Sequence, residues 1–113
     1  PGVKTARWMN ADDHTKNIEL LKRMENVEED KRGCKYVNCI ALKYRDIEEV
    51  FEGVLYGTLT RHCTGKNGFG FDEIFRIDSG LTLAEITMEE KFKISPRKKA
   101  LDQMKMFLIN NYI

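Results

Sequence analysis

Cysteine and proline are both scarce in this 113-residue sequence, which has three cysteines and two prolines. The odd cysteine count and the lack of a C-x-x-C pair favour reduced thiols over a disulfide framework. A zinc site is an alternative, but the C-x4-C and adjacent His-Cys spacings match no recognised ligand pattern. Its ligands would be Cys34, Cys39, His62 and Cys63. We expect Cys39, which lies in an apolar run, to pack as a small hydrophobic side chain instead.

Long apolar runs and an excess of charge of one sign are also missing. No run approaches the roughly 20 residues that a membrane span needs, and the first residues lack the basic-then-apolar pattern of a secretory signal. The 19 basic and 18 acidic side chains leave a formal charge of only +1. Such a balance gives no global field toward nucleic acid or an acidic membrane. We therefore predict a cytoplasmic protein with no membrane or nucleic-acid partner, in which any recognition of anions is local.

Enough apolar material is present for one globular domain, since 42% of the residues are hydrophobic and 33% are charged. A chain of this size buries roughly 60–70% of its unfolded surface on folding. No internal repeat, low-complexity segment or interdomain linker interrupts it. We predict a single domain over residues 1–113.

Apolar spacing predicts a helix in the N-terminal third of the chain. Residues 1–8 show neither a helical nor a strand period. Asp12 or Asp13 can cap a helix that runs to about Asn26. One apolar stripe follows this helix and consists of Ile18, Leu20, Leu21, Met24 and Val27.

The middle of the chain favours strands. Residues 34–44 are apolar on both faces, which predicts a central strand, and residues 50–59 outline a second strand. A hairpin turn at residues 45–48 would pair the two antiparallel. After a glycine-rich loop at residues 64–72, a short strand is predicted at residues 74–77.

Helices are expected again toward the C-terminus. A helical stretch is predicted from Thr82 to Glu90, and Ser95 followed by Pro96 marks the start of the last helix. The buried face of that helix would consist of Leu101, Met104, Phe107 and Leu108. Together these elements predict an α/β fold, in which a long antiparallel hairpin belongs to a mixed sheet with flanking helices.

The glycine-rich loop is the first candidate binding segment. Its flexible backbone lies beside Lys66 and the aromatic residues Phe69 and Phe71, so it could approach a nucleotide closely and stack on its base. The phosphate-loop pattern G-x-x-x-x-G-K-[ST] is absent. The alternative is a wide turn with both phenylalanines in the core.

A basic run around the start of the last helix is the second candidate. The free amides and the dipole at a helix N-terminus favour a bound anion. The alternative is a solvated helix face, and the neighbouring Glu89 and Glu90 would weaken the local field. The basic residues are Lys91, Lys93, Arg97, Lys98 and Lys99.

Taken together and in order, these segments are far more specific than either alone. Residues 67–75 (N-G-F-G-F-D-E-I-F) resemble the G-G-F-G-Y-D-P-I-F signature of the inosine triphosphate pyrophosphatases, also called non-canonical purine NTP pyrophosphatases. Residues 83–97 resemble the A-E-L-T-x-E-E-K-x-x-I-S-H-R segment of this family, and residues 1–8 are similar to its P-G-x-x-S-A-R-[YW]. The resemblance covers the whole chain.

The resemblance implies hydrolysis of ITP, XTP and their deoxy forms to the monophosphate and pyrophosphate. It implies a substrate-binding site in which Phe69 stacks on the base, Lys91 contacts the substrate and Arg97 reads an oxo group of the purine. The substrate-binding residues would be Phe69, Gly70, Phe71, Asp72, Lys91 and Arg97. Pro96 replaces the usual histidine, which affects discrimination between purines. Glu73 replaces the usual proline, which predicts a less rigid loop and a negative charge near phosphates.

The segments that hold the triphosphate and the metal in this family, T-x-N-x-x-K and D-D-S-G, do not occur in this chain. The chain therefore resembles the C-terminal half of the family fold, and we expect it to be inactive alone. Mg²⁺ is expected for the family, but we assign no catalytic residue and no metal ligand here. Asp12 and Asp13 belong to a helix start, and the E-x-x-E pair of Glu49 and Glu52 lies in a predicted strand, where that spacing separates the side chains.

The partners that this interpretation predicts are a purine nucleoside triphosphate and a second copy of the chain, because loss of half of a fold would bare apolar surface or a strand edge. One rival function is a non-catalytic binding or assembly module. A second rival is general RNA binding through the C-terminal lysines and the loop aromatics, against which the near-neutral charge argues.

Overall fold

The computed structural model describes residues 2–113, with side chains described from residue 12 onward. Pro1, which opens the P-G-V-K-T-A-R-W segment, lies outside the described residues. The chain divides into two compact units, and each is considered by itself. The first comprises the residues up to Cys34 together with Tyr56–Met88, and the second comprises Lys35–Leu55 and Glu89–Ile113. The single domain expected over the whole chain stays a prediction.

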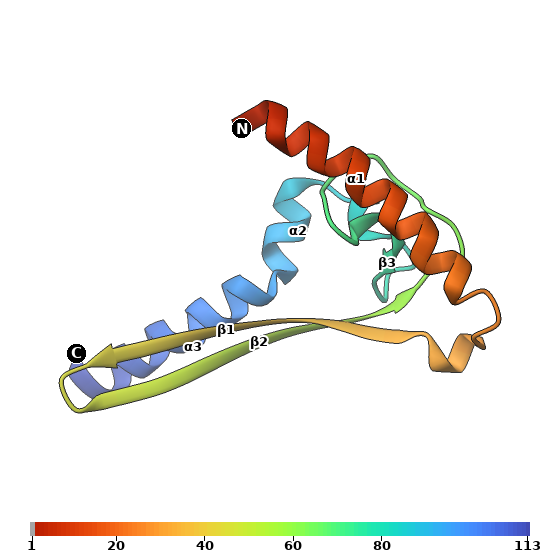
Figure 1. Ribbon diagram of the computed structural model, residues 1–113. Helices are drawn as coiled ribbons and strands as arrows, with labels where there is room; N and C mark the ends of the chain where they lie inside the picture. The colour runs from red at the N-terminus through yellow and green to blue at the C-terminus, as the bar shows by residue number, and fades with distance from the viewer. Residues whose placement is uncertain (1) are drawn as a thin grey trace. The chain divides into compact units, whose positions relative to one another are not determined.

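The strands lie between an N-terminal helix and two C-terminal helices along the chain (Figure 1). Their order is α1 (Gly2–Arg23), the 3-10 helix η1 (Glu29–Lys31), β1 (Gly33–Tyr44), β2 (Ile47–Leu59), η2 (Asp72–Ile74), β3 (Phe75–Arg76), η3 (Leu83–Glu85), α2 (Met88–Ile94) and α3 (Pro96–Tyr112). The strands form one sheet in the order β1-β2-β3, and β2 pairs antiparallel with β3. The predicted α/β class with a long antiparallel hairpin is confirmed. The described strands are antiparallel, so the mixed character expected of the sheet is not seen within them.

Helix α1 begins ten residues or more before the predicted capping aspartates, so the predicted start of this helix at Asp12 or Asp13 is wrong. Residues such as Lys4, Ala6 and Arg7 have high helix propensity, and a helix needs no apolar period to form. At its other end the helix stops at Arg23, close to the predicted boundary.

Strand β1 lies at the edge of the sheet, which corrects its prediction as a central strand. Its residues alternate between partly buried and exposed positions, because only one face of the strand is covered. Cys39 falls on the exposed face, so the expectation that it packs in the core is also wrong. The hairpin turn is shorter than predicted and contains Arg45, whose φ of 53° is left-handed.

The core of the first unit lies around the 3-10 helices η2 and η3. Ile74 and Phe75 are buried there together with Leu83, Ala84 and Ile86. The predicted helix from residue 82 is instead a single 3-10 turn, and α2 begins only at Met88. The turn begins at Thr82, whose backbone N–H donates to the Glu85 carboxylate at 3.0 Å and whose hydroxyl donates to Thr64 O at 2.7 Å. It ends at Ile86, whose backbone is extended, with φ of −108° and ψ of 163°.

A buried arginine joins three segments of the first unit. Arg32 is 1% exposed, and its guanidinium donates to four backbone carbonyl groups. These carbonyls belong to Met24 at 2.6 Å, Val27 at 3.3 Å, Leu59 at 3.1 Å and Thr60 at 2.8 Å. The planar donors of an arginine can satisfy several acceptors at once, which a lysine cannot. This side chain therefore links the end of α1 to the end of β2.

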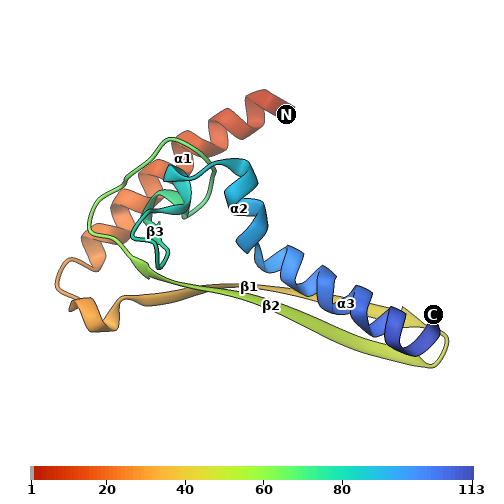
Figure 2. The same cartoon turned by 180° about the vertical axis from the view of Figure 1, so that it is seen from behind.

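The second unit consists of the long part of the hairpin and the helix α3 that runs beside it in both views (Figures 1 and 2). The Phe51 and Phe107 rings pack with centroids 5.6 Å apart. Gly53 permits close approach, since a side chain there would overlap the backbone carbonyl of Pro96. The predicted start of α3 is confirmed, because Pro96 opens the helix and Ser95 Oγ accepts from Lys98 N. None of the helices described here is both long and apolar enough to cross a bilayer.

Candidate functional site

The glycine-rich loop is folded around a buried carboxylate. Asp72 is 4% exposed, and its Oδ2 accepts a hydrogen bond from the Phe69 backbone N–H at 3.0 Å. The Asp72 N–H donates in turn to Phe69 O at 3.2 Å. Gly68 and Gly70 have φ of 83° and 62°, values that only glycine adopts readily. Asp72 therefore shapes the loop, and the base or sugar contact that the resemblance implies for it stays a prediction.

Helix α1 holds the same loop from one side (Figure 2). The Gly70 N–H donates to Asp13 Oδ2 at 2.7 Å, and Asn17 Nδ2 donates to Gly70 O at 2.9 Å. Asn17 is 1% exposed. Both polar groups of the Gly70 backbone are thus fixed by residues one helical turn apart. Sequence reasoning missed Asn17, although its four-residue spacing from Asp13 could have pointed to a shared helix face.

The base of the loop is anchored to η3 and to the residue that follows it. The backbone N–H groups of Lys66 and Asn67 both donate to Ala84 O, at 3.0 and 2.9 Å. Asn67 Nδ2 also donates to Ile86 O at 3.1 Å. These contacts and those from α1 fix the backbone on both sides of the loop, which is the kind of preorganisation that a binding site requires.

The two aromatic side chains of the loop face outward. Phe69 is 65% exposed and Phe71 is 48% exposed, so the alternative in which both lie in the core is wrong. Phe69 and its neighbours line a small cavity of about 110 Å³. Its lining consists of Asp13, residues 65–70, Asp72 and Glu73. The loop thus presents an aromatic side chain next to a small recess.

The basic candidates belong to the second unit. Lys91 is partly exposed in the last turn of α2, and Arg97 is exposed in the first turn of α3. Two other members of the basic run have structural partners. Lys98 Nζ forms an ion pair with Asp102 at 2.8 Å, and Lys99 Nζ donates to Val54 O at 2.7 Å. Part of the basic run therefore stabilises the fold through hydrogen bonds and an ion pair.

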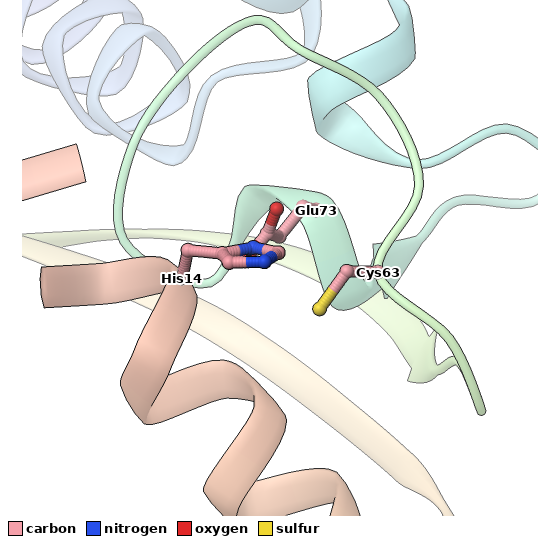
Figure 3. Close-up of side chains that lie close together, drawn as sticks. All are labelled: His14, Cys63 and Glu73. Carbon is pink, nitrogen blue, oxygen red and sulfur yellow. The ribbon is translucent and has the colours of Figure 1, made fainter. Parts of the chain in front are cut away.

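A group of three chemically different side chains lies next to the loop (Figure 3). His14 comes from α1, Cys63 from the segment after β2 and Glu73 from η2, and one possible donor atom from each lies within 4.8 Å of the others. Glu73 Oε1 accepts from His14 Nδ1 at 2.8 Å and from Asn17 Nδ2 at 3.0 Å. The lower rigidity expected of a loop with glutamate in place of proline stays a prediction. The alternative zinc ligand set that contains Cys34, Cys39 and His62 forms no such group among the described side chains.

The ionisation of this group follows from its surroundings. Burial, the Glu73 charge and a hydrogen bond to Glu73 raise the pKa of the Cys63 thiol to about 11. Burial alone would raise the pKa of Glu73, but hydrogen bonds from Asn17, His14 and Cys63 outweigh it and leave this pKa below its ordinary value. At neutral pH the group consequently pairs a thiol with a carboxylate.

Magnesium does not fit the donor atoms found here. Mg²⁺ takes oxygen ligands in octahedral geometry and usually keeps several waters. The group formed by His14, Cys63 and Glu73 offers one nitrogen, one sulfur and one carboxylate. From residue 12 onward, no second group of three potential ligands comes together.

Known proteins resemble this chain in both sequence and fold. The sequence model of the Ham1 family matches residues 1–107. A dITP/XTP pyrophosphatase of Thermoanaerobacter sp. (strain X514) is 44% identical over 112 residues, which cover 96% of this chain and 57% of that protein. The solved Ham1 protein of Staphylococcus aureus superposes with a TM-score of 0.79 at 31% identity, covering 97% of this chain and 58% of the other. The dITP/XTP pyrophosphatase of Mycobacterium abscessus gives a TM-score of 0.69 at 39% identity, with 92% and 55% covered. The chain thus spans about half the length of the curated relatives it matches.

Proposed function

Because this chain belongs to the Ham1 family, we propose that it is the nucleotide-binding part of a pyrophosphatase acting on non-canonical purine nucleoside triphosphates. The substrates would be ITP, dITP and XTP, and the products the monophosphate and pyrophosphate. The names of its relatives, dITP/XTP pyrophosphatases, support this substrate class. The observation that carries the proposal is the glycine-rich loop, whose backbone is fixed on both sides and whose Phe69 ring is 65% exposed beside a recess.

In the proposed binding mode, the Phe69 ring stacks on the purine base. The recess beside it is lined by residues 65–70 together with Asp13, Asp72 and Glu73, and it would take the base edge or the sugar. Gly70 leaves room for close approach, because no atom lies within 4 Å of the position that a side chain there would occupy. Phe71 and Asp72 complete the loop, Phe71 as a second exposed aromatic residue and Asp72 as its internal support.

Lys91 and Arg97 are proposed as further substrate contacts on the strength of the sequence resemblance. The planar donors of Arg97 suit a purine carbonyl, which hypoxanthine and xanthine carry where adenine carries an amine. Lys91 supplies positive charge to a phosphate. Pro96 opens α3 and has no side-chain donor, so the selectivity would rest on Arg97.

We further propose that the chain by itself binds the nucleotide without cleaving it. Attack on a triphosphate needs an activated water and cations that neutralise the phosphoryl charge. Lys91 and Arg97 could supply part of the second requirement. The one potential ligand group among the described side chains does not suit Mg²⁺. The carboxylates that hold Mg²⁺ in the active pyrophosphatase would then be contributed by residues outside this chain.

A non-catalytic assembly module is the second candidate, and the position of β1 favours it. This 12-residue strand forms the edge of the sheet, and residues such as Val37 are exposed along it. An open edge can pair with the same edge of a second copy, which gives a closed dimer. Light scattering at high micromolar concentration tests this: a dimer is expected, and a clean monomer would exclude it.

Calorimetric titration of ITP into the chain tests the nucleotide site. Phe69→Ala is expected to lower the binding free energy by about 1–3 kcal/mol, because a stacked base loses its platform. Tyr56→Ala is the matched control, since Tyr56 is 71% exposed in the same unit but lies on β2. Arg97→Ala is expected to narrow the preference for ITP over ATP. Equal ITP affinity for the wild type and the Phe69 variant would show that the site lies elsewhere.

A further inference from the structure

The group His14, Cys63 and Glu73 contains none of the proposed substrate contacts, although Glu73 also lines the recess beside Phe69, and its chemistry is that of a metal site. The three residues are far apart in sequence and converge from a helix, a loop and a 3-10 turn of the first unit (Figure 3). Each offers a different donor: an imidazole nitrogen, a thiol sulfur and a carboxylate oxygen. Glu73 has 17% of its side chain exposed, whereas His14 has 52% exposed. A solute can thus reach the group from the histidine side.

We propose that His14, Cys63 and Glu73 bind a divalent transition-metal cation of the zinc type. Thiolate, imidazole and carboxylate are the three ligand classes of protein zinc sites, in which bond lengths of roughly 2.0–2.3 Å place neighbouring ligand atoms about 3.3–3.8 Å apart. The donor atoms here lie within 4.8 Å of one another. The His14 side chain is 52% exposed. Shifts of roughly 1.5 Å or less would bring the donor atoms to zinc-ligand spacing.

A cation would replace a proton that the group already shares. Without metal, the Cys63 thiol hydrogen-bonds to the Glu73 carboxylate, and burial together with that negative charge keeps the thiol protonated. A dication near the carboxylate reverses this preference, because a coordinating thiol is deprotonated. Binding of one Zn²⁺ therefore forms a Zn–S bond to Cys63 and releases its proton to solvent.

The surroundings supply an outer support and an open position. Asn17 is almost fully buried and donates to Glu73 Oε1 at 3.0 Å, which holds the carboxylate in place as outer hydrogen bonds do in metal sites. His14 and Cys63 also line a cavity of about 550 Å³. A water molecule or a small ligand in this cavity can take the fourth position of a tetrahedral ion.

The site would act on the glycine-rich loop. Glu73 follows the buried Asp72, and Asn17 bonds both Glu73 and the Gly70 carbonyl. A bound cation would fix these residues together and so stiffen the loop. Glu73 stands where the resembled signature has proline, so the carboxylate ligand is a departure from that signature rather than a part of it. The proposed cation is thus distinct from the substrate contacts named above and from the magnesium that the resemblance implies.

Titration with Co²⁺ tests the proposal, because cobalt occupies zinc sites and a cobalt–thiolate bond absorbs in the near ultraviolet. The chain is first treated with a chelator and kept reduced with a phosphine. We expect the band to saturate at one equivalent of Co²⁺ and to disappear on addition of Zn²⁺ but not of Mg²⁺. Cys63→Ser should abolish the band, whereas Cys39→Ser, at an exposed thiol of the other unit, should leave it unchanged.

Two further variants keep the test independent of the thiol. His14→Gln, on the helix surface, and Glu73→Gln should each weaken Co²⁺ binding by at least about tenfold, since loss of a ligand costs no less than loss of an outer partner. Zn²⁺ should raise the thermal midpoint of the wild type and not of His14→Gln, and circular dichroism checks that the variants are folded. A band that fails to saturate, that survives Cys63→Ser, or that is equally strong with His14→Gln would overturn the proposal.

Discussion

Replacing Gly68 by alanine should lower the free energy of unfolding more than replacing Gly70 by alanine, although both residues have positive φ. A side chain at Gly70 would meet no atom within 4 Å. At Gly68 the added carbon would overlap the Asp72 carboxylate, the group that accepts from Phe69 N. Both variants therefore carry the same kind of backbone strain, and only Gly68→Ala adds a steric overlap with the Asp72 carboxylate.

The difference can be worked from these contacts. Left-handed backbone disfavours alanine by roughly 1–2 kcal/mol, and the stiffer unfolded chain offsets part of this. Gly70→Ala should accordingly lower the free energy of unfolding by about 1 kcal/mol. Gly68→Ala also displaces the Asp72 carboxylate, and the loss of a hydrogen bond to a charged group adds about 1.5–3 kcal/mol.

Urea unfolding followed by circular dichroism measures both values. We expect Gly68→Ala to be about 2 kcal/mol less stable than Gly70→Ala, a gap that corresponds to roughly 5–10 °C in melting temperature for a domain of this size. The Gly68 variant should also bind ITP more weakly, because Phe69 loses its backbone support. Equal stability of the two variants would refute the role given to Asp72 in shaping the loop.

Three further predictions concern residues outside the loop. Arg32→Met should destabilise the first unit by roughly 3 kcal/mol in urea unfolding, because four carbonyl groups lose a charged donor. Arg61 is exposed, so Arg61→Met should change the free energy of unfolding by less than about 1 kcal/mol. Gly53→Ala should cost at least about 2 kcal/mol and loosen the packing of α3, visible as faster amide exchange in that helix. The pKa of the Asp102 carboxyl should lie below its ordinary value, because Lys98 donates a hydrogen bond to it. The stability that this carboxylate contributes is present at neutral pH and is lost as acid protonates it. In the Lys98→Gln variant, nuclear magnetic resonance titration should show a higher pKa for Asp102.

Elements that depend on local signals were predictable from the sequence. The alternation of apolar residues identified the hairpin, and the pair Ser95-Pro96 marked the start of α3 because its side chain and ring suit the first turn of a helix. Strand β1 was misplaced in the sheet for a physical reason. Its exposed face carries apolar residues such as Val37 and Cys39, and this pattern predicted a second buried face.

Features that depend on long-range contacts were not predictable. Arg32 lies in a charged segment that reads as a solvated turn, yet its guanidinium is buried against carbonyls from two distant segments. His14 and Glu73 are 59 positions apart, and no spacing rule connects them. The loop residues were identified by resemblance, but the inward role of Asp72 required its hydrogen bond to Phe69 to be seen.

Pyrophosphate release from ITP by the chain alone, measured with Mg²⁺ in mildly alkaline buffer, tests the central claim most directly. The chain should bind ITP and release no pyrophosphate above background, because binding without an activated water does not lower the barrier to cleavage. Release at a robust rate that disappears in Lys91→Ala would contradict the account, since the chain would then contain a complete catalytic site.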